Sequence, residues 1–498
     1  MRGRCRRLRG LAIAAGCVVA LTAVPTAATA AAHAPGALKV TWMAGYQAPG
    51  TPAKYNMVGV IKVGSPSARN VLVLMPGTSA AAAYFVPFAK WLVSALPNWQ
   101  VWAVERRENL LDDQSVLNLG KLGKASPTEV FNYYLGYLAD HSITHHFVAV
   151  PDSSVEFAKQ WGMNVTVQDL HRVIDAARKL GGKVVLGGHS LGGAVVTAYA
   201  TWDFGGRAGA DQLAGLVYDD GGSFPAVSAQ EAQASLAALN APGATPWLAF
   251  GGIPAPLAGI FNATGSLSVL VDPNSPSLGQ MFPLLPSELK PSVPVTNEAQ
   301  YGYALNAATS PPSLLAAQAH LGAGISTQTI NGYHTWDGTG AITPITRFAA
   351  MFAGEGILDA NGTEWYFPQR LTDDSGAVGN GIANPAQAIL NVHSTMGQHL
   401  SRHLLIYAIC TALGTKAVLL GAQALAAQSR IPAKNLFLVN RQATYSHNDP
   451  AGAYPNNAFF STLVPFLRRA APPRPAVPAT IRPPRRAAPA PSPPRFTG

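Results

Sequence analysis

The stretch KVVLGGHSLGG, residues 183–193, places a serine between a short run typical of a β-strand and an apolar run typical of a helix. Ser190 has a glycine two positions before it, Gly188, and another two positions after it, Gly192. A serine in a sharp strand-to-helix turn has a strained backbone, and a Cβ atom at either glycine position would collide with the neighbouring chain. The pattern predicts a turn that exposes the serine hydroxyl, with the N–H of Leu191 at the start of the next helix.

The segment before this turn has the features of an amphipathic helix. Thr166 is predicted as its N-cap with Asp169 three residues on, apolar residues lie on one face, and a glycine pair, 181–182, ends it. Helix, strand, turn and helix form an α/β unit, which argues against a glycine-rich turn that arose by chance. With these motifs the sequence resembles the α/β-hydrolase superfamily, and within it secreted lipases and esterases.

Short β-rich runs alternate with helical stretches along much of the chain. The runs lie at residues 38–42, 57–63, 71–75, 100–105, 183–187, 213–218, 404–410 and 435–440. The helical stretches lie at residues 80–96, 166–180, 191–202, 415–429 and 458–468. This alternation predicts an α/β fold with a mostly parallel eight-stranded sheet and helices on both faces. The serine follows the fifth run, as the resemblance implies.

The composition divides the chain into a core, a large insertion and two terminal segments. Residues 1–30, with five arginines and then an apolar stretch, are predicted to be a cleaved signal peptide, so the mature protein is expected to be secreted or periplasmic. The hydrolase core is predicted at 31–222 and 401–469. Residues 107–163 form one insertion in it, and residues 223–400 form a longer one that the resemblance identifies as a lid or cap. A Pro/Arg-rich tail, 470–498, is predicted to be disordered.

The net charge of +10 comes from the two ends of the chain. Residues 1–10 carry five arginines and residues 468–498 carry seven, and neither segment contains an acidic residue. The remaining 23 basic residues nearly balance the 25 acidic ones, so no nucleic-acid-binding surface is indicated. The tail is interpreted as a solubilising segment or, alternatively, as a contact to an anionic envelope polymer or membrane surface. The oligomeric state is not indicated.

A catalytic serine needs a histidine to accept its proton, and the resemblance places that histidine after the last strand. His447 is the only histidine beyond His403, which abuts the seventh strand and is interpreted as structural. His189, inside the turn, is interpreted as a packing or pocket residue. His447 is therefore the candidate general base.

The acid that orients His447 is predicted at the end of the sixth strand. No Asp or Glu occurs from residue 375 to 447, so the position that the resemblance favours, after the seventh strand, holds no carboxylate. Asp219 and Asp220 follow the sixth strand, and Asp220 is preferred because it lies nearer the glycine turn, with Asp219 as the alternate. The alternative is that both aspartates only cap that turn. Asp449 is too close in sequence to orient His447 and is interpreted as a brace of its loop.

The second oxyanion donor is expected in the loop after the third strand, where residues 76–79 read PGTS. The N–H of Thr78 is the first choice and that of Ser79 the second. Arg106 and Arg107 follow the fourth strand and are predicted to hold a loop through Asp112 or Asp113, or alternatively to contact a polar headgroup.

No zinc-ligand spacing, phosphate-binding loop or dinucleotide motif occurs, so neither a cofactor nor a metal is expected. The sequence predicts a serine hydrolase that cleaves carboxylic esters, in line with the lipase and esterase resemblance, through a Ser190-His447-Asp220 triad. The apolar insertion favours a hydrophobic acyl chain and a small-molecule or lipid ester. An envelope acyltransferase, a peptidase and a non-catalytic binding protein with the same fold are the alternatives.

Overall fold

Eight strands form one sheet in the order β1-β2-β4-β3-β5-β6-β9-β10. The computed structural model describes residues 38–222, 224–250, 253 and 256–472, so the predicted signal segment and the tail beyond residue 472 lie outside the described residues. The strands of the sheet are β1 (Val40–Ala44), β2 (Met57–Val63), β3 (Asn70–Met75), β4 (Trp99–Glu105), β5 (Val184–His189), β6 (Gly215–Asp219), β9 (Leu405–Cys410) and β10 (Leu436–Asn440). The predicted eight-stranded α/β architecture is confirmed.

Within this sheet β2 runs antiparallel to both of its neighbours, and the pairs from β4 to β10 are all parallel. The carboxyl ends of parallel strands meet at one edge of a sheet. The segments that follow β3, β4, β5, β6, β9 and β10 therefore reach the same edge, which we call the carboxyl edge. These are the segments on which the sequence places its candidate site residues.

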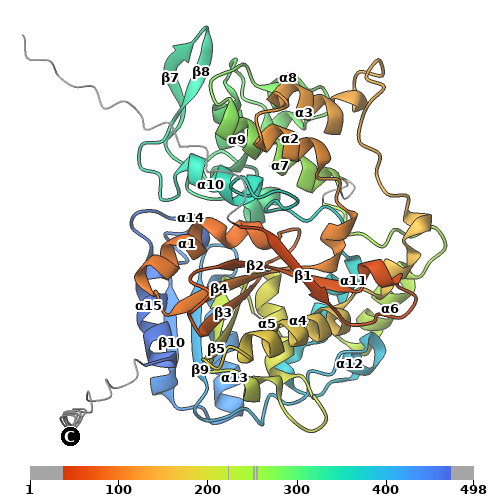
Figure 1. Cartoon of the computed structure of the whole chain (residues 1–498), viewed down its shortest axis with the longest axis vertical. Helices are drawn as coiled ribbons and strands as arrows, with labels where there is room; N and C mark the ends of the chain where they lie inside the picture. The colour runs from red at the N-terminus through yellow and green to blue at the C-terminus, as the bar shows by residue number, and fades with distance from the viewer. Residues whose placement is uncertain (1–37, 223, 251–252, 254–255, 473–498) are drawn as a thin grey trace, which may run out of the picture. The chain divides into compact units, whose positions relative to one another are not determined.

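Helices cover both faces of the sheet (Figure 1). The helices of the described chain are α1 (Val86–Ala95), α2 (Ser115–Lys121), α3 (Pro127–Tyr134), α4 (Met163–Arg178), α5 (Leu191–Thr201), α6 (Ala229–Leu239), α7 (Leu257–Val271), α8 (Leu278–Met281), α9 (Asn297–Leu305), α10 (Ile345–Ala353), α11 (Gln369–Ser375), α12 (Pro385–Leu390), α13 (Thr415–Gln428), α14 (Asp449–Gly452) and α15 (Ala458–Ala470). Of these helices, none has the length and apolar character that crossing a bilayer requires.

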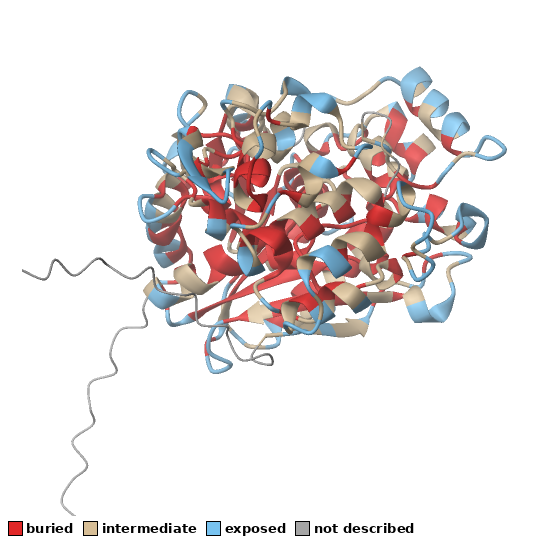
Figure 2. Ribbon diagram, turned by 90° about the horizontal axis from the view of Figure 1, so that it is seen from above, coloured by how far each residue is buried: buried red, intermediate tan, exposed pale blue. Residues whose placement is uncertain are grey.

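Alternate side chains of each central strand enter two separate cores. In β3, Val71 and Val73 pack in one core with α4, α5 and α13. Leu72 and Leu74 pack in the other core with α1 and α15. Because both faces are covered, the strands are apolar without interruption, which is typical of a parallel sheet. Figure 2 shows the buried residues concentrated along the sheet and the helices beside it.

The two insertions contribute to one group of helices beside the sheet. α2 and α3, from residues 107–163, pack against α7, from residues 223–400. Their shared apolar cluster includes Tyr134, Leu267 and Trp365. A two-stranded hairpin, β7 (Gly324–Ile330) and β8 (Tyr333–Asp337), lies next to α9. We call α2, α3, α7, α8, α9, α10 and this hairpin the cap.

Three helices of the long insertion, α6, α11 and α12, lie outside the cap. α6 packs against α11 and α12, and α11 contacts α4 and α5 on a face of the sheet (Figure 1). Residues 223–400 therefore do not form one continuous cap, although the whole range was predicted as a lid. Its role at the substrate stays a prediction.

Every predicted strand of the sheet overlaps an observed strand, with ends that differ by two residues at most. The predicted N-cap of α4 is wrong. α4 begins at Met163, and Thr166 lies inside the helix, where its hydroxyl donates to the carbonyl of Gly162 at 3.1 Å. The Met163 N–H instead donates to Asp374 Oδ2 at 2.9 Å. This cap comes from α11, more than two hundred residues away, so no local pattern could show it.

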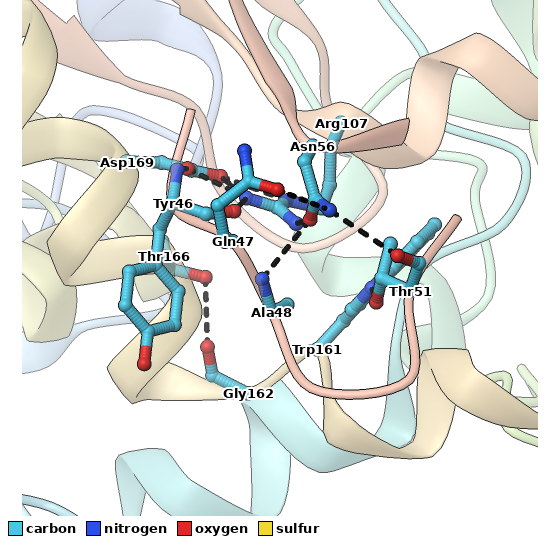
Figure 3. Close-up of polar contacts among 10 residues, drawn as sticks. All are labelled: Tyr46, Gln47, Ala48, Thr51, Asn56, Arg107, Trp161, Gly162, Thr166 and Asp169. Carbon is cyan, nitrogen blue, oxygen red and sulfur yellow. Dashed lines mark hydrogen bonds and ion pairs between the residues drawn. The ribbon is translucent and has the colours of Figure 1, made fainter. Parts of the chain in front are cut away.

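Arg107 links α4 to the segment between β1 and β2 (Figure 3). Its Nε donates to Asp169 Oδ2 at 2.9 Å, its Nη1 to Asn56 Oδ1 at 2.8 Å, and its Nη2 to the carbonyl of Tyr46 at 2.9 Å. Only 1 % of Arg107 is exposed. The predicted partners, Asp112 and Asp113, are wrong for this arginine, because Asp169 on α4 provides the buried counter-charge.

Replacing Arg107 with alanine is expected to lower the free energy of unfolding by about 3–5 kcal/mol, because it leaves the buried Asp169 carboxylate without its cation. Denaturant unfolding measures this loss. Arg178→Ala is the control, since the Arg178 side chain is 49 % exposed and its nearest carboxylate oxygen, on Asp175, is 3.8 Å away. It should change stability by about 0.5 kcal/mol or less. Equal effects of the two substitutions would disprove the structural role of Arg107.

Candidate active site

Ser190 lies at the carboxyl edge, directly between β5 and α5. Its backbone has φ 56° and ψ −128°, in a region that residues other than glycine rarely adopt. A Cβ atom at Gly188 would lie 2.2 Å from the carbonyl oxygen of Gly192, and a Cβ at Gly192 would lie 2.3 Å from that of Met75. The two glycines therefore permit the close packing that holds Ser190 in this conformation.

The loop after β3 lies against Ser190. A Cβ atom on Gly77 would lie 2.7 Å from the Ser190 Cβ and 3.3 Å from its Oγ. An eight-stranded sheet of this order, with a strained serine after its fifth strand and the loop after its third strand beside that serine, defines one architecture. The chain has the α/β-hydrolase fold. In this fold the N–H groups that bind an oxyanion come from the residue after the serine and from the loop after β3.

Neither a family model nor a curated protein matches the chain. Solved structures of α/β-hydrolase-fold proteins are similar over most of its length, at low identity. A Sulfolobus solfataricus protein assigned as a lipase is 13% identical, with 87% of this chain and 97% of that chain covered and a TM-score of 0.42. The thioesterase domain from the curacin biosynthetic pathway is 12% identical, with 86% and 99% covered and a TM-score of 0.38. A monoglyceride lipase from Saccharomyces cerevisiae is 10% identical, with 83% and 92% covered and a TM-score of 0.35. The fold assignment therefore depends on the sheet order and the serine turn.

His447 and Asp220 contact each other, although 227 residues separate them in the chain. His447 Nδ1 lies 2.6 Å from Asp220 Oδ2, and both residues are 2 % exposed. This contact directs the other ring nitrogen, Nε2, away from Asp220. Within the described chain no hydrogen bond joins His447 to Ser190 Oγ, a contact that is often long in ligand-free sites and shortens when substrate binds.

Asp220 is held by the segment that follows β9. Its Oδ1 accepts from the Thr411 N–H at 2.6 Å and from the Gly414 N–H at 3.2 Å, and its Oδ2 also accepts from the Thr411 hydroxyl. Burial acts to raise the pKa of Asp220, but the hydrogen bonds from His447 and Thr411 outweigh it and lower that pKa. Asp220 is therefore ionised at neutral pH and oriented toward His447. Thr411 lies at the end of β9, where no carboxylate occurs, and no pattern in the sequence marks it as a partner of Asp220.

Asp219 has a different environment. Neither of its carboxylate oxygens has a hydrogen-bond partner among the described residues, and the residue is 2 % exposed. Burial, with a smaller contribution from the charge of Asp220, raises the pKa of Asp219 well above its usual value. The charged form of Asp219 is therefore disfavoured, and Asp219 forms no hydrogen bond with His447 among the described residues.

His189 packs beneath the His447 ring. The two ring centroids lie 4.3 Å apart, and His189 Nε2 lies 3.0 Å from the His447 carbonyl oxygen. His189 also stacks on Tyr84, with 5.1 Å between the ring centroids. Burial, followed by the charge of His447, lowers the pKa of His189 to about 3, so this ring is neutral and supports the His447 loop.

Asp449 connects the His447 loop to two residues of the long insertion, His320 and Thr343. Its Oδ2 accepts from the Ser446 N–H at 2.7 Å and lies 2.5 Å from His320 Nδ1, while its Oδ1 accepts from the Thr343 hydroxyl at 2.7 Å. The neighbouring Asn448 Nδ2 donates to the carbonyls of Ala316 and Gln318, each at 3.1 Å. Residues 446–449 are thereby fixed by residues 316–320 and 343 of the long insertion.

Across the residues that the structure describes, no three His, Cys, Asp or Glu side chains are grouped in a way that could hold a metal ion. A small internal cavity of about 10 Å³ is lined by residues that include Arg106, Arg107, Glu108 and Asp169. That volume has room for about one water molecule and none for a substrate.

The His320–Asp449 contact is expected to make stability depend on pH. The hydrogen bond from Asp449 is the main cause that raises the pKa of His320 above its usual value. A raised histidine pKa stabilises the folded state below the unfolded pKa of about 6.5, and this stabilisation disappears as the pH rises through the folded pKa. His320→Gln should therefore lower the melting temperature more at pH 5.5 than at pH 9. An equal or larger loss at pH 9 would refute this dependence.

Proposed function

We propose that the protein is a serine hydrolase that cleaves carboxylic esters through an acyl-enzyme on Ser190. The observation that carries this proposal is the strained serine at the carboxyl edge, packed against the Gly221 turn that directly follows Asp220, together with the buried 2.6 Å contact between Asp220 and His447. A serine hydroxyl is a weak nucleophile on its own, and such a pair is the usual means of activating it. The geometry supports this function better than a non-catalytic role, which requires none of these contacts.

Each residue has a defined step in the proposed mechanism. Ser190 Oγ attacks the ester carbonyl carbon while His447 Nε2 accepts the hydroxyl proton, and Asp220 stabilises the imidazolium that forms. The N–H groups of Leu191 and Thr78 donate to the oxyanion. Leu191 is the first residue of α5, where helical N–H groups have no partner within the helix. The Thr78 N–H donates to no acceptor among the described residues.

The tetrahedral intermediate collapses when the bond to the alkoxy group breaks. His447 returns its proton to the departing alcohol, and the acyl group stays on Ser190. Water then adds to the acyl-enzyme with His447 again as the base, which releases the carboxylic acid and restores the serine. If an alcohol replaced water in this step, the same residues would catalyse acyl transfer, so analysis of products with and without an alcohol acceptor separates the two reactions.

The substrate class and the location of the enzyme in or outside the cell are part of the same proposal. We propose an ester with a hydrophobic acyl chain, because the cap contains an apolar cluster in which Ile260, Leu267 and Phe282 take part. Secretion through the 1–30 segment and a contact of the basic tail with an anionic surface are proposed from the sequence. Both segments lie outside the described residues, apart from residues 470–472.

Ser190→Ala should abolish ester turnover without loss of the folded state, with a decrease of about 10⁶-fold in kcat as for other serine hydrolases. Hydrolysis of a short p-nitrophenyl ester measures the activity, and circular dichroism checks the fold. Ser79→Ala is the matched control, because Ser79 lies in the loop beside the site but its hydroxyl has no proposed role. Near-normal turnover by a folded Ser190→Ala protein would exclude the proposed mechanism.

Asp220→Asn should reduce kcat by about 10⁴-fold, because asparagine keeps the shape of the side chain but cannot stabilise the imidazolium. Asp219→Asn is the matched control and should have a mild effect, since neither carboxylate oxygen of Asp219 has a hydrogen-bond partner among the described residues, His447 included. Steady-state kinetics of both variants provide the comparison. The reverse order of activities would transfer the role of the acid to Asp219.

A further inference from the structure

The loop that carries the proposed oxyanion donor Thr78 is held by the side chain of Arg106. Arg106 Nη1 donates to the carbonyl of Pro76 at 2.9 Å, and its Nη2 donates to those of Gly77 at 3.0 Å and Ala80 at 2.8 Å. Arg106 is 4 % exposed. The predicted partners Asp112 and Asp113 are therefore wrong for this arginine too, although it does hold a loop.

Glu364 holds Arg106 in place from the long insertion. Arg106 Nε donates to Glu364 Oε2 at 2.8 Å, and Arg106 Nη2 donates to the same oxygen. The backbone beside Glu364 also pairs with the loop. The Glu364 N–H donates to the Ser79 carbonyl at 2.9 Å, and the Ala81 N–H donates to the Gly362 carbonyl at 3.0 Å. Residues 76–81 are thus fixed on one side by Arg106 and on the other by residues 362–364.

These hydrogen bonds set the direction of the Thr78 N–H. In a trans peptide the C=O of one residue and the N–H of the next point in opposite directions. Because the Gly77 carbonyl points to Arg106, the Thr78 N–H points away from it. The same rule applies three peptide bonds further on, where the Ala80 carbonyl points to Arg106 and the Ala81 N–H reaches Gly362.

We infer that Arg106, held by Glu364, is a positioning residue that sets the direction of the Thr78 N–H beside Ser190. This inference depends on the proposed function, since it assigns Arg106 a part in stabilising the oxyanion. The guanidinium is required because its planar fork donates to three carbonyls and a carboxylate at once. A lysine in its place keeps the charge but has a single nitrogen, which cannot reach all four acceptors.

The test compares Arg106→Lys with Arg107→Lys. Arg107 is the adjacent residue, is equally buried and also pairs with a carboxylate, but its partners Asp169, Asn56 and Tyr46 lie outside residues 76–82. Each variant and the wild type are assayed with a short p-nitrophenyl ester and with its thionoester, in which sulfur replaces the carbonyl oxygen. Sulfur is a weaker hydrogen-bond acceptor, so a correctly placed N–H favours the oxygen ester.

Arg106→Lys should lower kcat for the oxygen ester by about 10–100-fold with little change in KM, since a small misplacement of a catalytic group has an effect of this size. The loss for the thionoester should be several-fold smaller. Arg107→Lys should keep the wild-type ratio of oxygen ester to thionoester activity. A wild-type ratio in Arg106→Lys, or the same change of ratio in Arg107→Lys, would overturn the inference.

A second variant and a hydrogen-exchange measurement complete the test. If Arg106→Lys does not fold, the double variant Arg106→Gln/Glu364→Gln replaces it, because it leaves neither charge buried alone. Hydrogen exchange of the peptide that covers residues 77–83 should be faster in either variant than in the wild type and in Arg107→Lys, and unchanged exchange would also overturn the inference. Exchange is measured without substrate, so it separates failure of the positioning role from failure of the proposed function, in which the wild type itself would not turn over esters.

Discussion

The conformation of Ser190 at the end of β5 is the constraint on which the rest of the site depends. A serine at φ 56° is strained, and such strain persists only where surrounding contacts over-determine the backbone. Three neighbouring segments provide them here. A Cβ at Gly221 would lie 1.8 Å from the Ser190 carbonyl oxygen, one at Gly77 2.7 Å from the Ser190 Cβ, and one at Gly193 2.4 Å from the Gly221 carbonyl carbon. The turns after β3, β5 and β6 therefore pack backbone to backbone around one residue.

This packing also brings the supporting residues to the same place. Gly221 directly follows Asp220, so the turn that touches Ser190 also carries the carboxylate that contacts His447. Gly77 belongs to the loop that Arg106 and Glu364 hold. The long insertion therefore provides contacts that hold two loops of the site. Residues 362–364 fix the loop that follows β3, and residues 316–320 fix the loop of His447.

Local patterns were sufficient to predict the sheet and to single out Ser190 as a candidate. Apolar runs and the glycines around Ser190 are local signals, whereas His447 is a candidate because the resemblance places a histidine after the last strand. The N-cap of α4 and the partners of Arg106 and Arg107 were predicted wrongly, because Asp374, Glu364 and Asp169 reach them from distant parts of the chain. No spacing rule connects Arg106 to a residue 258 positions away. Asp219 and Asp220 are adjacent in sequence, and only their three-dimensional contacts give them different environments.

The central claim is that Ser190 is the nucleophile, and the most direct measurement is the site of covalent modification by a fluorophosphonate. The full chain is incubated with the reagent, and mass spectrometry of the intact protein and of its peptides locates the adduct. The account predicts one phosphonyl group per chain, on Ser190. In Asp220→Asn the reagent should react much more slowly than in the wild type, or not at all. No adduct on the folded protein, or an adduct on another serine such as Ser79 with Ser190 unmodified, would contradict the account.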